Sequence, residues 1–242
     1  MNKQLERYSV ISQKNPREIL LLRGKGCSWR NCRFCDYHLD YSLDQEANAQ
    51  LNKEVLSQVT GDFGVLEIIN SGSFVDLDAR TMELIKETCI AKHISQIHFE
   101  SHWLHRQDIQ ALRDFFQKDA IAVKMKIGVE TFDRDFRETV MVKGIDTSRP
   151  EDIAEYFDEC CLLFGLTGQI LESMRNDISI GLRYFERVCV NIMVDNTTPI
   201  KADPEVIAQF RDHLYADCLE NQRIDVLMEN TDFGVGKEIE HE

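Results

Sequence analysis

The feature that most constrains the fold of this chain is a repeated alternation of short apolar runs with longer amphipathic stretches. The apolar runs are nearly continuous and rich in β-branched residues, which is typical of parallel strands that are buried on both faces. We expect strands at residues 19–23, 65–70, 96–100, 122–130, 161–166 and 188–195, and a closing strand at 224–228.

Stretches with helical periodicity lie between and after these runs. They cover residues 45–59, 78–92, 106–117, 151–159, 168–183 and 203–220. In the last of them, Asp203 suits the N-cap and Pro204 suits the first helical position. Strands that alternate with helices in this way form right-handed parallel βαβ units.

Six such units are too few for an eight-fold barrel and too regular for two separate domains. The sequence therefore predicts an α/β fold, an open, partial (β/α)6 TIM-like barrel. We expect residues 1–242 to form a single domain, with a core at about 18–200 and a C-terminal helix and closing strand within 201–242. In barrels of this kind the chemistry gathers at the C-terminal ends of the strands, so the residues after each strand are the candidates for a site.

Charge and hydropathy exclude some classes of function. The chain holds 28 Lys and Arg residues against 42 Asp and Glu residues, a formal net charge of −14. Binding to a phosphate backbone relies on clustered cations, so this composition argues against a nucleic-acid partner. No apolar run approaches the ~20 residues of a membrane helix, and the first residues lack the apolar core of a signal peptide. We expect a cytoplasmic protein without a membrane association.

A glycine-led loop directly after the first strand concentrates three of the eight cysteines, Cys27, Cys32 and Cys35. Two inorganic centres compete for these thiols. Three cysteines can hold three irons of a [4Fe–4S] cluster and leave the fourth iron open. Alternatively, the three cysteines and His38 can form a closed Cys3His zinc site. The other five cysteines are spread along the chain and are expected to pack as small apolar residues.

The residues around the thiols favour iron. The loop carries basic side chains and no acid between the cysteines, with Arg23, Lys25, Arg30 and Arg33 as its cations. Nearby cations suit an anionic cluster and are expected to lower the thiol pKa.

The cysteine loop, with Phe34 directly before the last cysteine, resembles the cluster motif of the radical S-adenosylmethionine (radical SAM) superfamily. It departs from the usual spacing of three and then two residues, because four residues separate Cys27 from Cys32. Segments after the later strands, NSGSFVD at 70–76, HFESH at 98–102, GVET at 128–131 and FGLTGQ at 164–169, resemble those that contact SAM in this superfamily. The resemblance implies SAM contacts from Phe34, Ser71, Gly72, Ser73, Ser101, Glu130, Leu166 and Gln169.

The resemblance also implies a cofactor set and a reaction. The cofactors are a [4Fe–4S] cluster and SAM, and reductive cleavage of SAM gives a 5′-deoxyadenosyl radical that abstracts hydrogen from a substrate. An external electron donor of the flavodoxin or ferredoxin type is expected as a partner. The protein orients both reactants and excludes water. The sequence assigns no catalytic residue.

Among compact members of the superfamily, the chain is most similar to those that act on queuine in bacterial queuine salvage. This implies a small-molecule 7-deazaguanine substrate and cleavage of a C–N bond with release of preQ1. The candidate substrate-binding residues are Tyr37, His38, His102, Asp195, Asn196, Glu229 and Phe233, with the Phe233 ring suited to stack on a flat base. Two alternatives stay open: action on tRNA or another modified base, and a zinc-stabilised binding module. Asp195 equally suits a cap for the turn before Pro199.

Overall fold

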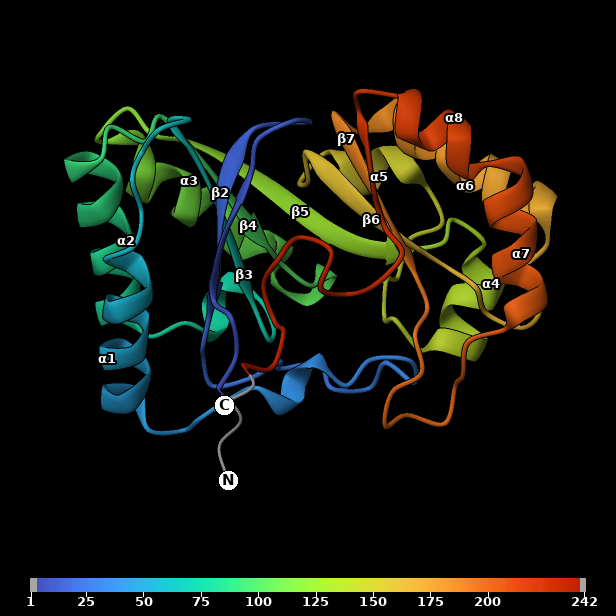
Figure 1. Ribbon diagram of the computed structural model, residues 1–242, viewed down its shortest axis with the longest axis horizontal. Helices are drawn as coiled ribbons and strands as arrows, with labels where there is room; N and C mark the ends of the chain where they lie inside the picture. Colours follow the sequence, from blue (N-terminus) through green and yellow to red (C-terminus); the bar gives the residue numbers. More distant parts are fainter. Residues whose placement is uncertain (1–3, 240–242) are drawn as a thin grey trace.

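The computed structural model describes residues 4–239, which are arranged around one curled sheet (Figure 1). Its strands are β1 (Tyr8–Ile11), β2 (Arg17–Leu22), β3 (Val65–Asn70), β4 (Gln96–Glu100), β5 (Ala122–Glu130), β6 (Glu159–Phe164), β7 (Arg187–Ile192) and β8 (Ile224–Leu227). Its α-helices are α1 (Gln45–Leu56), α2 (Ala79–Ala91), α3 (Ile109–Gln117), α4 (Arg134–Phe136), α5 (Pro150–Ala154), α6 (Leu171–Tyr184), α7 (Pro204–His213) and α8 (Tyr215–Glu220). Short 3-10 turns lie at η1 (Tyr37–Leu39), η2 (Phe74–Asp76) and η3 (Trp103–Asp108), and η4 (Arg137–Met141) is a π-helical turn.

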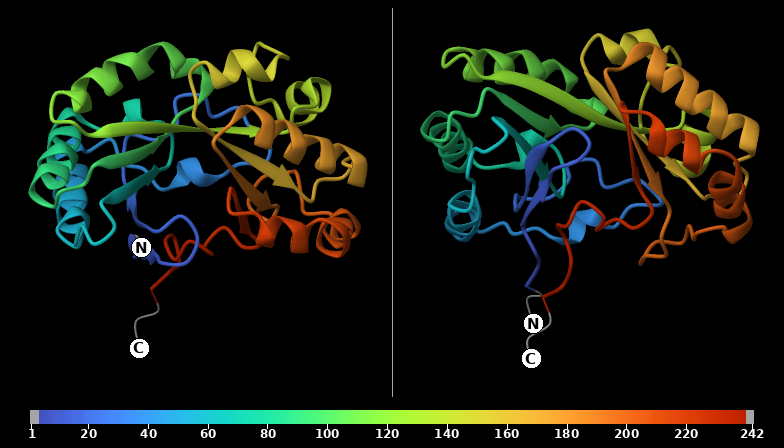
Figure 2. Two further views of the ribbon diagram at one scale, coloured as in Figure 1. Left: turned by 90° about the horizontal axis from the view of Figure 1, so that it is seen from above. Right: turned by 45° about the horizontal axis from the view of Figure 1, so that its top comes forward.

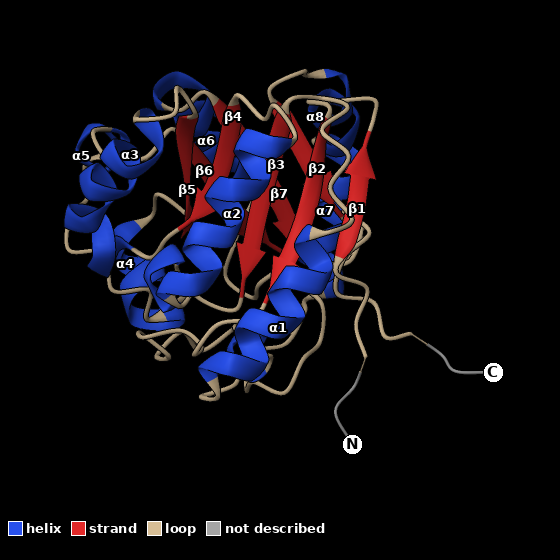
Figure 3. Cartoon of the chain, turned by 90° about the vertical axis from the view of Figure 1, so that its left-hand side faces the viewer, coloured by secondary structure: helices blue, strands red, loops and turns tan. Residues whose placement is uncertain are grey.

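The strands follow one another across the sheet in chain order. β1 pairs antiparallel with β2, and every later pair from β2 to β8 is parallel. The helices cover the outer face of the curled sheet, with α1 and α2 in front of the strands in the side view (Figures 2 and 3). The predicted partial barrel is confirmed. None of the helices among residues 4–239 is long and apolar enough to cross a membrane.

Acidic side chains fix the starts of several helices. Asp44 accepts a hydrogen bond from the backbone of Ala47 at the start of α1, and Asp78 accepts one from Thr81 at the start of α2. At α7 the predicted cap is confirmed, because Asp203 accepts from two backbone N–H groups and Pro204 occupies the first turn. Such caps satisfy backbone donors that have no partner within the helix.

The structure corrects the predicted elements in four places. The sequence prediction missed β1, a short strand at the edge of the sheet. β6 begins at Glu159, two residues before the predicted strand, and ends before Gly165, whose φ of +96° does not suit an extended strand. The helix expected to reach residue 159 ends at Ala154, and the helix expected at 203–220 is divided at Leu214 into α7 and α8.

The main apolar core lies between the sheet and its outer helices. It includes side chains such as Leu20, Ile68, Phe99 and Phe164, each of which is almost completely buried. A second, smaller cluster packs beneath the cysteine loop and consists of Phe34, Met141, Leu163, Leu166 and Met193. The main core therefore supports the sheet, and the smaller one supports the loop.

Inside the barrel, charged side chains replace apolar ones. Four neighbouring strands place Glu100, Lys126, Glu159 and Arg187 directly opposite one another in register, so the sign of the charge alternates from β4 to β7. Directly opposite residues on adjacent strands project from the same face of the sheet and interact. We call this row the barrel charge ladder.

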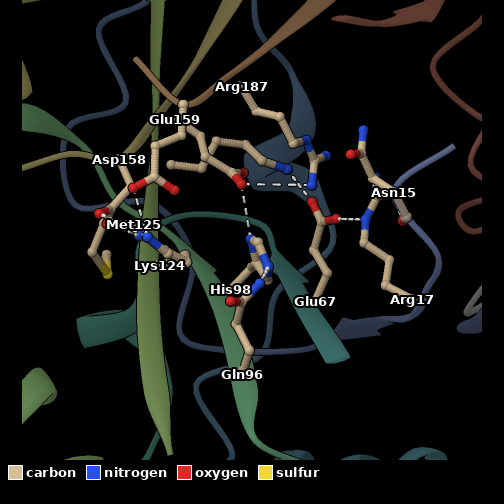
Figure 4. Close-up of polar contacts among 12 residues, drawn as sticks. Asn15, Arg17, Glu67, Gln96, His98, Lys124, Met125, Asp158, Glu159 and Arg187 are labelled. Carbon is tan, nitrogen blue, oxygen red and sulfur yellow. Dashed lines mark hydrogen bonds and ion pairs between the residues drawn. The ribbon is translucent and has the colours of Figure 1, made fainter. Parts of the chain in front are cut away.

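Further buried ion pairs extend the ladder toward β3, β2 and β8. Glu67, which is fully buried, forms ion pairs with both Arg17 and Lys126. Arg187 contacts Asp225 at 2.6 Å and Glu159 at 3.5 Å. His98 Nδ1 lies 3.1 Å from the Glu159 carboxylate, as the close-up in Figure 4 shows. The interior is thus held by a network of opposite charges to which all strands from β2 to β8 contribute.

The open side of the sheet is closed by the two ends of the described chain. The backbone N–H of Glu6 donates to the carbonyl of Lys237, and the N–H of Gly236 donates to the carbonyl of Glu6. The segment after β8 crosses the open side of the sheet between β1 and β8 (Figures 1 and 2). There the Phe233 ring lies 4.9 Å from the Arg17 guanidinium.

Replacing Glu67 with glutamine should destabilise the fold strongly. The Glu67→Gln variant keeps the shape of the side chain but leaves Arg17 and Lys126 without their shared counter-charge, and breaking a buried pair costs about 3–5 kcal/mol. Chemical denaturation followed by circular dichroism measures the loss. Glu46→Gln is the matched control, because Glu46 pairs with Arg80 on the surface and both side chains are more than half exposed. An equal effect of the two variants would contradict this role of the network.

The contribution of Glu67 should also depend on pH in a defined direction. Burial opposes its ionisation, but Lys126 and Arg17 outweigh that effect and hold its pKa well below the usual range. A group whose pKa is lowered by folding stabilises the protein above its unfolded pKa, about 4.3 for glutamate, and this stabilisation is lost as the pH falls toward the folded value. The difference in unfolding free energy between wild type and Glu67→Gln should therefore shrink below about pH 4.

Candidate active site

A cavity of about 510 Å³ lies inside the barrel and reaches the carboxyl ends of the strands. This volume falls within the range of small-molecule and cofactor sites. Most of the predicted site residues line it: Cys27, Cys32, Phe34, Cys35, Tyr37, His38, Ser71, Gly72, Ser73, Ser101, His102, Glu130, Asn196 and Phe233. The structure thus brings together residues that the sequence places up to about two hundred positions apart.

The cysteine loop accommodates its extra residue through a left-handed turn. Arg30, between the first two cysteines, has a φ of +52°, and its Nε donates to the carbonyl oxygen of Cys27 at 2.7 Å. Trp29 donates from its indole nitrogen to the carbonyl of Val142 at 3.0 Å, which anchors the tip of the turn. The turn absorbs the fourth residue while all three thiols still reach the cavity.

The segment after β3 is tied to this loop through Asp76. One carboxylate oxygen accepts from the Ser28 hydroxyl at 2.6 Å, and the other accepts from the backbone N–H of Ser73 at 2.8 Å. Gly72 makes the close approach possible, because a Cβ atom there would lie 2.9 Å from Cα of Cys27. The predicted cluster loop and the predicted SAM segment therefore form one packed unit.

The protonation of the thiols differs from the sequence prediction. Burial raises the pKa of Cys35 to about 12 and also raises the pKa of Cys32, and in both cases the nearby Lys143 opposes the effect. The basic residues of the loop itself do not produce the predicted lowering. A metal centre must therefore displace the protons of these two thiols, which is the usual coupling of metal binding to deprotonation.

The three thiols of the cysteine loop face one space. Cys27, Cys32 and Cys35 are free and partly exposed, and all three line the same cavity. His38, the fourth ligand of the alternative zinc site, lines it too. Three cysteines can hold a multi-iron cluster at three of its corners.

Glu130 and Lys143 form a polar pair beside the thiols. Lys143 Nζ lies 2.7 Å from the Glu130 carboxylate, and Glu130 itself has a φ of +70°, a strained conformation for a residue with a side chain. Gly128 leaves room for the pair, since a Cβ atom there would lie 2.9 Å from Lys143 Nζ. The contact with Lys143 holds the carboxylate at the cavity wall, where its oxygens can accept hydroxyl hydrogen bonds.

His102 packs against the cysteine loop and bonds to the backbone of Lys143. Its Nε2 lies 2.7 Å from the carbonyl of Lys143, its Nδ1 accepts from the N–H of Leu104, and Trp29 stacks on its ring at 5.1 Å. Burial, with a further contribution from Lys143, lowers the pKa of His102 to about 4. The imidazole is therefore neutral near pH 7 and both ring nitrogens are engaged, so His102 contributes a ring face rather than a free nitrogen.

Four predicted site residues lie away from the cavity wall. Leu166 packs in the small core cluster, and Gln169 bonds back to the backbone of Leu163 and Leu166. Asp195 accepts from the N–H of Ala202, in agreement with its alternative interpretation as a turn cap. Glu229 is placed in a turn, where its N–H donates to Asp232.

Sequence reasoning missed several residues that line the cavity. They include Asp40, Glu100, Lys126, Lys143 and Asn191, together with Cys161 and Cys189, which were expected only to pack. Most of these side chains lie within strands rather than after them. The available signal was a polar side chain at every second residue of an apolar strand, as at Lys124 and Lys126.

Comparisons with known proteins agree with this geometry. No protein-family model matches the chain, and neither does any curated protein. A solved structure of queuine lyase from Clostridium spiroforme, bound to SAM and queuine, is 44% identical, has a TM-score of 0.92, and covers 97% of this chain and 100% of that chain. The chain belongs to the queuine lyase family of radical SAM enzymes.

More distant structures share the fold of the queuine lyase family. SuiB from Streptococcus suis is 14% identical with a TM-score of 0.54, over 88% of this chain and 50% of that chain. A structure of SuiB bound to S-adenosylmethionine is 16% identical with a TM-score of 0.55, over 89% and 51%. Membership of the queuine lyase family favours an enzyme over the zinc-stabilised binding module.

The Cys32→Ala variant should lose its cluster and keep its fold. The loop lies outside the main core, so removal of one thiol should prevent cluster assembly without unfolding the barrel. Iron analysis and visible absorption after anaerobic reconstitution measure the first effect, and circular dichroism measures the second. Cys218→Ala is the control, because Cys218 is buried near the outer helices and does not line the cavity. Global unfolding of Cys32→Ala would show that the loop stabilises the barrel itself.

Proposed function

We propose that this chain is a radical SAM lyase that cleaves the C–N bond of queuine and releases preQ1, 7-aminomethyl-7-deazaguanine. The observation that carries the proposal is the likeness, over the whole chain, to a queuine lyase whose structure binds both SAM and queuine. The cavity supports it, because thiols, hydroxyls and the Glu130 carboxylate border one space of suitable volume.

In this proposal Cys27, Cys32 and Cys35 hold a [4Fe–4S] cluster. When bound, the cluster supplies the electron for the reductive cleavage of SAM to methionine and a 5′-deoxyadenosyl radical. The protein's own task is to orient two ligands and to exclude water. Both tasks suit a cavity that the curled sheet, the cysteine loop and the segment after β8 surround on different sides.

The remaining predicted SAM contacts divide by position. In this proposal the backbone around Gly72, with the oxygens of Ser71 and Ser73, binds the methionine end of SAM. The Glu130 carboxylate is placed to accept hydrogen bonds from the ribose hydroxyls. Lys143 adds a positive charge between Glu130 and the thiols, where it offsets the charge of an anionic cluster.

The proposal includes an external electron donor of the flavodoxin or ferredoxin type, because each cleavage of SAM consumes one electron. It also places the enzyme in the cytoplasm. All eight cysteines are free thiols, which suits a reducing compartment.

Product analysis tests the proposal directly. The reconstituted enzyme, incubated anaerobically with SAM, a reductant and queuine, should form 5′-deoxyadenosine and preQ1 together. The Cys32→Ala variant, which lacks a cluster ligand, should form neither. Formation of 5′-deoxyadenosine while queuine remains intact would show that queuine is not the substrate, although the enzyme still cleaves SAM.

Binding measurements distinguish the alternative of a tRNA substrate from queuine. A tRNA-modifying enzyme should bind tRNA tightly, with an affinity that falls steeply as salt is added. We expect no measurable tRNA binding at low salt, because a protein with a net charge of −14 repels the phosphate groups of tRNA. Salt-sensitive tRNA binding, together with conversion of the modified base within tRNA, would show that tRNA and not queuine is the substrate.

A further inference from the structure

Three acidic side chains line the cavity, and two of them already have close partners. Asp40 receives two hydrogen bonds from Arg7, at 2.8 and 3.1 Å. Glu130 is bonded to Lys143 at 2.7 Å. Within residues 4–239, the Glu100 carboxylate has one charged contact, Lys126 Nζ at 3.6 Å. Glu100 therefore retains most of its capacity to accept hydrogen bonds from a ligand.

Glu100 and Lys126 are adjacent because their strands pair in register. They lie directly opposite each other on β4 and β5, and both line the cavity. The Glu100 side chain is 29% exposed, whereas that of Lys126 is 3% exposed and held from behind by Glu67. The pair therefore presents one ammonium donor beside two carboxylate acceptors, with the ammonium fixed in place by the barrel charge ladder.

This order of groups complements the pyrimidine edge of a deazaguanine. That edge carries the O6 acceptor, the N1–H donor and the 2-amino donor in a row. An ammonium followed by two carboxylate oxygens offers one donor and two acceptors in the matching order. We propose that Lys126 and Glu100 bind the pyrimidine edge of the 7-deazaguanine, with Lys126 on O6 and Glu100 on N1–H and the 2-amino group.

The electrostatics of the free site support this assignment. Burial raises the pKa of Glu100, Lys126 opposes the shift, and the nearby Glu67 carboxylate adds to it. The ionised form of Glu100 is thus poorly stabilised within the barrel and stands to gain from new N–H donors. Hydrogen bonds to a charged acceptor are stronger than those between neutral groups, so a ligand that donates twice to Glu100 gains both affinity and selectivity.

The inference rests on the proposed function. Binding measurements with two ligands test the assignment of Glu100 separately from that function. The probes are queuine and its analogue without the 2-amino group, titrated calorimetrically into anaerobic, cluster-loaded enzyme with SAM and no reductant. Wild type should prefer queuine over the analogue by about 10-fold or more, as expected for hydrogen bonds to a charged group. Glu100→Gln should bind queuine about 10-fold more weakly and lose most of this preference.

Two further variants control the experiment. Glu159→Gln is the matched control, because Glu159 belongs to the barrel charge ladder but does not line the cavity. It should keep the preference for queuine even if its stability falls. Glu100→Asp keeps the charge and withdraws the carboxylate by one methylene, so it should show an intermediate loss of queuine affinity with unchanged iron content and circular dichroism.

The outcomes distinguish the inference from the function. If Glu100→Gln keeps the full preference for queuine, while wild type converts queuine to preQ1, the assignment of Glu100 is overturned and the function stands. If Glu159→Gln loses the preference as completely as Glu100→Gln does, the effect belongs to the network and the assignment is likewise overturned. If wild type neither binds nor converts queuine, the proposed function fails first.

Discussion

The structure depends on the compensation of opposite charges inside the barrel. Buried ions are expensive unless each is paired and hydrogen-bonded, so the chain can bury Arg17, Glu67, Lys126, Glu159 and Arg187 only because the strand register places opposite charges side by side. A shift of one strand by one residue would turn its charged side chain toward the outer helices. The network therefore specifies the register of the sheet, whereas the apolar core outside the sheet supplies most of the burial.

The same network also shapes the interior that a ligand meets. Two members of the barrel charge ladder, Glu100 and Lys126, reach the cavity, while Glu159 and Arg187 remain beneath it. At the upper rim, Lys143 takes a similar place between Glu130 and the thiols of Cys32 and Cys35. Positive charges that come from distant parts of the sequence thus compensate each cluster of negative groups, which explains how a chain with a net charge of −14 can hold an anionic centre.

The sequence was sufficient for the architecture and for the residues that follow each strand. The apolar runs at β3, β4 and β5 were predicted with their observed bounds, since nearly continuous hydrophobicity marks strands with two buried faces. The loop with Cys27, Cys32 and Cys35 and the segment around Gly72 were found because short motifs bring their residues together in the chain. Lys143 has no such signal, because its role depends on the fold that brings η4 and the loop after it beside the cysteines.

The strand interiors were harder to interpret for a physical reason. A charged residue within an apolar run is ambiguous in a single strand, and its partner, such as Glu67 for Lys126, lies on another strand. Only the three-dimensional pairing shows that both are buried. Glu159 is an example: the sequence prediction ended a helix there, yet Glu159 begins β6 and its carboxylate contacts His98. The same ambiguity concealed Glu100 as a cavity residue.

The closure of the barrel by the segment after β8 bears on how the protein is made. A chain emerges from the ribosome N-terminus first. Strands β1 to β8 therefore leave the ribosome before Asn230, Thr231, Phe233 and Gly236, which complete the cavity wall and pair with the backbone of Glu6. The cysteine loop is therefore synthesised about two hundred residues before the segment that completes the cavity wall, so the cavity can close only at the end of synthesis.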